Sequence, residues 1–260
     1  SDRAVLLPDN VGKHTKIVHI DIDPAEIGKN LSTFIPVVGD AKEILVQIMG
    51  AEPTRKSDEW TDLLKAKKEK LVLDYAPRKF GVNPKAFVNL LSRTLPDDNI
   101  YCADVGQNQI WSAANCEIKK GRFLTSGGMG CMGYSIPAAI GAKFAEPERT
   151  VVAVCGDGSF QMQMMELATI CQNDVDIKIV VMKNNKLGLV KEIQKKSYKN
   201  NEFGVDLAGS PDVVALARAY GIPGRSIDNM DVAEEAIAEM LDHKGTFLLE
   251  CIVDENEPSM

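Results

Sequence analysis

From Asn83 onward, short apolar runs alternate with longer amphipathic segments. The runs, such as "TVVAVCG" and "DIKIVVMKN", are apolar almost throughout, which is typical of strands buried on both faces. The segments between them, such as "DVAEEAIAEMLDHKG", repeat apolar residues at helical spacing. Strands and helices that alternate in this way form parallel sheets covered by helices on both sides. The pattern therefore predicts a doubly wound α/β fold, with residues 84–260 as its domain.

Two shorter β-to-α steps precede this domain. In each, an apolar stretch is followed by a capping aspartate and a helix-like pattern: Asp23, with a proline after it, in the first and Asp40 in the second. Two such steps are too few to bury a core of their own. We therefore interpret residues 1–50 as the C-terminal remnant of a second α/β domain, and the charged residues 51–83, with one expected helix, as a connector.

Composition narrows the classes of partner. The 37 acidic and 30 basic residues leave a net charge of −7 with no basic block, so nucleic acid is not an expected partner. No apolar stretch is long enough to span a membrane and the N-terminus has no signal-peptide pattern, so we expect a cytoplasmic protein. The three histidines are far apart and the six cysteines form no C-x-x-C pair, which argues against zinc and against a histidine base.

One buried strand stops at Gly156-Asp157-Gly158, and the next strand-like run ends at Asn184. If these strands are neighbours, a carboxylate and an amide oxygen meet at one point, and such oxygens are ligands for Mg²⁺. The glycines would let the backbone approach a ligand closely, and Ser159 would begin a helix whose N–H groups hold an anion. The pattern predicts a site for a divalent ion that carries a diphosphate.

Two other interpretations fit the same residues. Gly-Asp-Gly is also an ordinary turn sequence. The stretch "GGMGCMG" (127–133) matches G-x-G-x-x-G, and Asp157 would then be the acid that binds a dinucleotide ribose. Against the dinucleotide, "RFLTSG" before the glycines is short and polar for a first buried strand, and Asn184 has no role. Spacing alone leaves the diphosphate and dinucleotide interpretations equally open.

A family resemblance favours the first interpretation. "GDGSF" followed by "NN" resembles the thiamine diphosphate motif, in which the Asp and an Asn bind Mg²⁺. The stretches "DVGQNQIW", "LTSGGMGCMGYSIPAAIGAKFA", "GDGSFQMQMMELATI" and "NNKLGLV" look like the cofactor domain of acetolactate synthase large subunits. "KIVHIDIDPAEIGKN" is similar to the end of that family's central domain, so the resemblance covers nearly the whole chain.

The resemblance implies roles for individual residues. Asp157 and Asn184 would bind Mg²⁺ with their side chains and Lys186 with its backbone oxygen; Asn184 stands four residues before Gly188, as the family's ligand does. Met132 matches the bulky apolar residue that supports the bent cofactor and is the one catalytic candidate. The implied cofactor-binding residues are Val105, Gly106, Gln107, Asn108, Gly130, Met132, Gly156, Asp157, Gly158, Ser159, Asn184, Leu187, Gly188 and Leu189.

The sequence departs from the family in several places. Many relatives have His where Asn108 stands, and synthases that favour 2-ketobutyrate as acceptor have Trp at Ile193. Glu166, within a predicted helix, is interpreted as a surface carboxylate. The family's N-terminal domain, with the glutamate that activates the cofactor, is not in the sequence, so the chain resembles a C-terminal portion of a longer subunit.

The implied activity is the condensation of two pyruvates to 2-acetolactate with loss of CO₂, in branched-chain amino acid biosynthesis or an acetoin pathway. The fragment alone is expected to be inactive. The cofactors would be thiamine diphosphate and Mg²⁺, and the full-length subunit allows for FAD. Expected partners are a 2-oxo acid substrate, a second copy in a homodimer or larger homo-oligomer, and a small regulatory subunit. The alternatives are another thiamine diphosphate-dependent 2-oxo acid decarboxylase or oxidase, and a non-catalytic cofactor-binding module.

Overall fold

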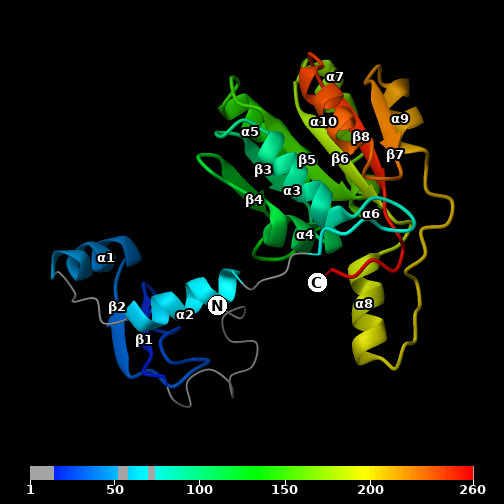
Figure 1. The fold of residues 1–260 in the computed structure, drawn as a ribbon. Helices are drawn as coiled ribbons and strands as arrows, with labels where there is room; N and C mark the ends of the chain where they lie inside the picture. The colour runs from blue at the N-terminus through cyan, green and yellow to red at the C-terminus, as the bar shows by residue number, and fades with distance from the viewer. Residues whose placement is uncertain (1–14, 52–57, 70–73, 260) are drawn as a thin grey trace. The chain divides into compact units, whose positions relative to one another are not determined.

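The computed structural model describes residues 15–51, 58–69 and 74–259 (Figure 1). By its internal contacts the chain divides into two units, Ser1–Val72 and Leu73–Met260. Each unit is described by itself.

The second unit is built on a parallel sheet with the strand order β4-β3-β5-β6-β8-β7 (Figure 1). Its strands in the described chain are β3 (Ile100–Ala103), β4 (Arg122–Thr125), β5 (Val151–Gly156), β6 (Lys178–Lys183), β7 (Gly224–Ile227) and β8 (Phe247–Ile252). The doubly wound α/β prediction is confirmed for this unit. The direction of strand succession reverses between β3 and β5, and ligands of such sheets bind at the carboxyl ends of the strands beside that reversal.

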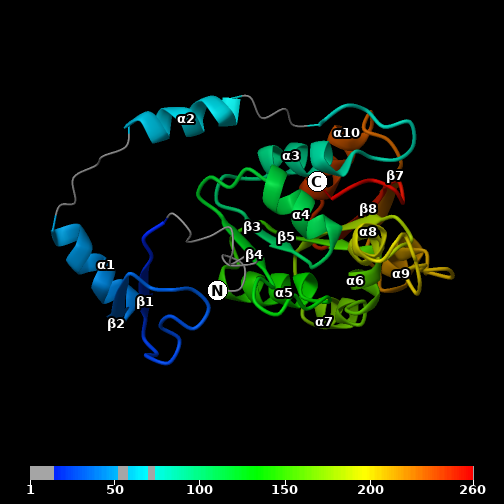
Figure 2. The same cartoon turned by 90° about the horizontal axis from the view of Figure 1, so that it is seen from below.

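Helices cover both faces of the sheet, as the view from below shows (Figure 2). One face carries α3 (Pro84–Thr94), α4 (Gln107–Asn115) and α10 (Ala233–Asp242); the other carries α5 (Ser135–Ala145), α7 (Glu166–Gln172) and α9 (Val213–Ala219). Alternate residues of β5 enter the two cores: Val152 and Val154 pack on the first face, and Ala153 and Cys155 on the second. Burial on both faces explains why the strands are apolar almost throughout.

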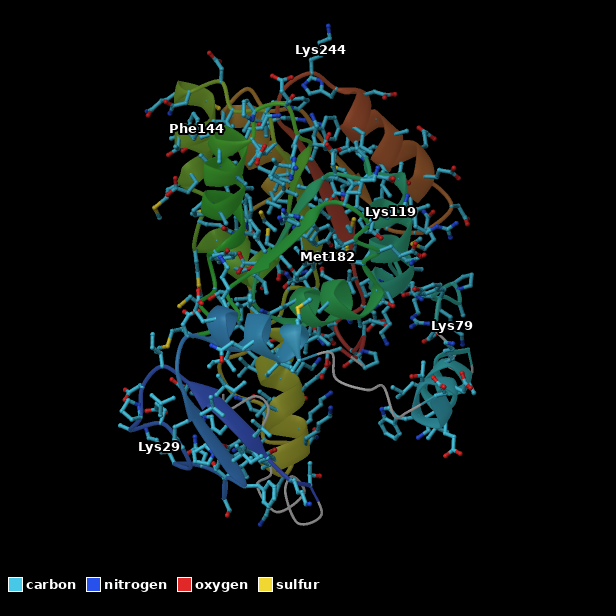
Figure 3. All side chains as sticks on the ribbon, turned by 90° about the vertical axis from the view of Figure 1, so that its left-hand side faces the viewer. Lys29, Lys79, Lys119, Phe144, Met182 and Lys244 are labelled. Carbon is cyan, nitrogen blue, oxygen red and sulfur yellow. The ribbon has the colours of Figure 1, made fainter. Side chains whose placement is uncertain are left out.

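Side chains fill the interior of this unit densely (Figure 3). Met182, near the end of β6, is only 2% exposed and closes the core directly beneath the carboxyl ends of the strands. The floor of any site at those ends is therefore rigid and apolar.

Several local elements differ from the sequence-based expectation. The helix expected over residues 159–172 is split into α6 (Asp157–Gln161) and α7, because the chain turns between them and places the Gln163 side chain in the interior. The helices α4 and α8 (Gly188–Ser197) and the edge strand β4 were not predicted. Neither α4 nor α8 has a side-chain N-cap, so the usual start signal is missing from their sequences.

In the first unit, β1 (Val18–Asp21) pairs in parallel with β2 (Ile35–Val38), and α1 (Ala41–Gly50) and α2 (Asp58–Glu69) follow. Asp40 caps α1 as predicted, accepting hydrogen bonds from the backbone N–H groups of Lys42 and Glu43.

The helix expected after Asp23 is wrong: the segment forms turns instead. Gly28 takes a φ of +75° there, and its N–H donates to His19 Nδ1 at 3.2 Å, which fixes the turn. None of the ten residues of α1, all of them described, is buried.

Candidate functional site

A cleft of about 430 Å³, open to solvent, lies at the carboxyl ends of β3, β5 and β6. It is therefore beside the reversal of strand order, where the fold predicts a ligand. Its lining residues are Val105, Gly106, Gln107, Asn108, Trp111, Met132, Gly156, Asp157, Gly158, Ser159, Met182, Asn184, Lys186, Leu187, Gly188, Leu189 and Val190.

The cleft brings together the residues that the sequence predicted, apart from Gly130. That glycine, with a φ of +69°, lies in the loop after β4, and a Cβ added there would have no atom within 4 Å. Trp111, Met182 and Val190 line the cleft but were not predicted. A helical reading of "QNQIWSAAN" would have placed Trp111 one turn after Gln107, on the same face.

Asp157 is 2% exposed at the junction of β5 and α6. Its Oδ1 accepts a hydrogen bond from the Gly158 N–H at 2.9 Å, and its Oδ2 accepts one from the Asn185 N–H at 2.6 Å. Burial raises the pKa of Asp157 to about 6 in spite of these bonds. A cation bound here would stabilise the ionised carboxylate, so the environment fits a metal ligand.

Asn184 follows β6, and β5 and β6 are paired neighbours as the sequence argument required. Its Oδ1 accepts a hydrogen bond from the Lys186 N–H at 3.0 Å, and its Nδ2 donates to Gln107 Oε1 at 3.0 Å. The Lys186 side chain pairs with Asp206 and Glu255, so its role in the cleft is left to its main chain. Carboxylate, amide and main-chain oxygens are the donors that Mg²⁺ prefers.

Two glycines allow the close approach of chain segments in the cleft. A Cβ added at Gly158 would lie 2.7 Å from Leu187 Cδ2 and 3.5 Å from Met132 Cε. One added at Gly188 would lie 1.8 Å from Gln107 Oε1. Only glycine fits either position without displacing a neighbour, so the two turns are shaped around each other.

Asp104, which sequence analysis did not single out, ties the Met132 loop to the sheet. It is fully buried after β3; its Oδ1 accepts from the Gly133 N–H at 3.0 Å and its Oδ2 from the Ser135 N–H at 2.8 Å. Gln163 Nε2 also donates to Oδ2, at 2.9 Å. The signal was available, because Asp104 follows a buried strand as Asp157 does.

The predicted diphosphate residues use their side chains within the protein. Asn108 donates to the backbone oxygens of Asp104 and Val154, at 2.9 and 3.2 Å. Ser159 Oγ exchanges hydrogen bonds with the backbone of Gly156, both at 3.1 Å. The backbone N–H groups in the first turns of α4 and α6 are the donors left for an anion, because such groups have no partner within their helix.

Two further residues lie outside the cleft lining. Glu166 is the first residue of α7, where its Oε2 accepts a hydrogen bond from Thr169 Oγ1 at 2.8 Å. Ile193 lies on α8 with 49% of its surface exposed. Within the described residues, no helix has the length and apolar character needed to cross a membrane, and no group of three His, Cys, Asp or Glu residues forms a metal cluster.

Comparison with known proteins matches residues 104–251 to the C-terminal TPP binding domain of thiamine pyrophosphate enzymes, and residues 2–48 to the central domain of these enzymes. An acetolactate synthase of Arthrospira platensis is 35% identical over 98% of this chain and 45% of its own length. The large subunit of the Lactococcus lactis enzyme is also 35% identical, with the same coverage.

A probable large subunit from Methanocaldococcus jannaschii is 38% identical over 93% of this chain and 43% of its own length. The chain therefore spans less than half the length of these curated relatives.

Proposed function

Because the chain belongs to the thiamine pyrophosphate enzyme family and contains its cofactor-binding domain, we propose that the cleft holds the diphosphate of thiamine diphosphate through Mg²⁺. One observation carries the proposal: Asp157 and Asn184, at the ends of two paired strands, are joined through the turn that follows β6. The oxygen donors of this turn and the buried carboxylate suit Mg²⁺, and the close approach at Gly158 leaves backbone N–H groups facing the cleft.

In this proposal Asp157, Asn184 and the Lys186 carbonyl hold the metal. The N–H groups of Gly158 and Ser159 and the N-terminus of α4 bind the phosphates. The bound cofactor would supply the nucleophilic carbon and the electron sink for decarboxylation of a 2-oxo acid. Met132 would support the ring system from the side of the glycine loop, and Asp104 holds that loop in place.

We propose that the full-length subunit condenses two pyruvates to 2-acetolactate with loss of CO₂, as the names of the relatives imply. Residues 1–260 supply the diphosphate half of the site, while the family's activating glutamate belongs to an N-terminal domain outside the matched region. We therefore expect the 260-residue chain to bind cofactor weakly and to form no acetolactate.

The assembly and specificity are also proposals. A homodimer or larger homo-oligomer, a small regulatory subunit, FAD and a cytoplasmic location are proposed for the full-length protein. Acceptor preference depends on Ile193, since a pocket contact of this size is worth about 1–3 kcal/mol of discrimination. Another 2-oxo acid decarboxylase or oxidase would share the same metal site.

Calorimetric titration of the chain with thiamine diphosphate, in the presence and absence of Mg²⁺, tests the proposal. We expect binding that requires the metal and is lost on chelation. Equal binding under both conditions would remove the role of Asp157 and Asn184. A pyruvate assay on the same sample tests the activity, and rapid acetolactate formation would contradict the assignment of a half-site.

A further inference from the structure

A line of hydrogen-bonded polar groups runs from Asn184 away from the cleft. Asn184 Nδ2 donates to Gln107 Oε1 at 3.0 Å, and Gln107 Nε2 donates to Glu192 Oε1 at 2.6 Å. Glu192 in turn accepts from the Ser259 N–H at 2.6 Å and from Ser259 Oγ at 2.7 Å. We call Asn184, Gln107, Glu192 and Ser259 the amide relay. It links α4, α8 and the segment after β8 to a predicted metal ligand.

The chemistry of the groups fixes the direction of the relay. The Gln107 amide nitrogen faces two acceptors that cannot donate, the Glu192 carboxylate and the Glu257 backbone oxygen, the latter at 2.8 Å. If the Gln107 amide were reversed, its oxygen would face both acceptors and its NH₂ would face the Asn184 NH₂. The arrangement is therefore stable only with Gln107 Oε1 toward Asn184. Asn184 must then present its nitrogen to Gln107 and its oxygen elsewhere.

Packing prevents Gln107 from leaving the relay. Its side chain is 6% exposed, and Gly188 lies so close that an added Cβ would overlap its Oε1. The far end is anchored as well, because the Arg78 guanidinium donates to both carboxylate oxygens of Glu257, each at 2.8 Å. Thus the Glu257 backbone oxygen is held beside Gln107.

Glu192 is ionised at neutral pH. Burial acts to raise the pKa of this carboxyl, but the hydrogen bonds from Ser259 and Gln107 outweigh it and hold the pKa below its usual value. An ionised carboxylate only accepts hydrogen bonds, whereas a neutral amide at the same position would also donate.

We propose that Glu192 is a positioning residue, which acts through Gln107 to aim the Asn184 amide oxygen at the metal. This role rests on the proposed function, because Asn184 is a ligand only if the cleft holds Mg²⁺. Outer partners of this kind usually change metal affinity by about 10- to 100-fold. Since the Lys186 N–H also binds Asn184 Oδ1, we expect an effect at the lower limit of that range.

The variant Glu192→Gln tests the proposal, because it keeps the shape of the side chain and removes its acceptor-only character. We expect the Mg²⁺-dependent affinity for thiamine diphosphate, measured by calorimetry, to fall about tenfold. Glu192→Asp retains the charge but withdraws the carboxylate from Gln107, so it should weaken binding in the same direction. If Glu192→Asp binds like the parent, the effect of Glu192 is one of charge and the relay is wrong.

Glu202→Gln is the matched control. Glu202 pairs with Lys195 of α8 at 3.3 Å and carries the same charge. This control should bind the cofactor like the parent, and an equal loss in Glu192→Gln and Glu202→Gln would overturn the proposal.

A second readout needs neither cofactor nor metal. In the ¹⁵N spectrum of the metal-free chain, Glu192→Gln should shift the side-chain NH₂ signals of both Gln107 and Asn184, and Glu202→Gln should shift neither. An unmoved Asn184 signal overturns the relay. Failure of the parent to bind Mg²⁺ and thiamine diphosphate overturns the proposed function instead, so the two failures are distinguishable.

Discussion

Two glycine-rich loops, Gly156-Asp157-Gly158 and residues 127–133, look equally suited to phosphate in the sequence and differ in their surroundings. In the first, Asp157 is buried and a Cβ added at Gly158 would strike Leu187. In the second, Met129 is 91% exposed, and a Cβ added at Gly128 would find no atom within 4 Å.

The position of each loop in the sheet explains the difference. The first follows β5, an inner strand beside the reversal of strand order, whereas the second follows the edge strand β4. A glycine pattern therefore indicates a ligand only when the preceding strand is central. The second loop reaches the cleft through one residue, Met132, and through its attachment to Asp104.

The largest expected effect is that of Asp157→Ala. We expect it to remove measurable Mg²⁺-dependent binding of thiamine diphosphate, because the charged ligand is lost. The metal-free chain should stay folded, since burying this carboxylate is itself unfavourable, as its raised pKa shows. Calorimetry and thermal unfolding measure the two properties. Asp98→Ala, at an exposed position before β3, is the control and should change neither.

The next largest effect is expected for Gly188→Ala. The new Cβ would lie 1.8 Å from Gln107 Oε1 and 2.9 Å from Asn184 Nδ2, so both side chains must move. We expect the Mg²⁺-dependent affinity to fall about tenfold and the free energy of unfolding to fall by about 1–3 kcal/mol. Titration and urea unfolding provide the measurements. Parent-like values would mean that the amide relay rearranges without cost.

A smaller effect is expected for Gly158→Ala. Its Cβ would lie 2.7 Å from Leu187 Cδ2, which is the end of a flexible side chain and can rotate away. We expect a loss of about 1 kcal/mol in the free energy of unfolding and about threefold in affinity. If Gly158→Ala binds more weakly than Gly188→Ala, the phosphate contact at Gly158 outweighs the packing at Gly188.

The smallest effect is expected for Gly128→Ala in the second loop. An added methyl group there meets open space, so stability should stay within about 0.5 kcal/mol of the parent. Cofactor affinity should be unchanged in the same titration. A tenfold loss would show that the second loop binds phosphate, and the contrast between the loops would fail.

Sequence alone predicted the parallel sheet and the neighbouring positions of Asp157 and Asn184, because both follow from the order of buried runs. It did not predict α4 or α8, whose starts carry no side-chain cap, nor the partner of Gln107, which lies 85 residues away at Glu192. Contacts of that length depend on strand order, which the local pattern does not encode. The error after Asp23 has a local cause, since Gly28 forms a turn that competes with the helix cap.

The attachment of Glu257 has a consequence for the time at which the site forms. Its contacts with Arg78 and Gln107 span 179 and 150 residues of sequence. During synthesis the ribosome releases this segment after all the strands of the sheet, and closing loops of this length is slow. The sheet can therefore form while Gln107 still lacks its second acceptor. Maturation of the cofactor site should be the final folding step, limited by the docking of one short segment.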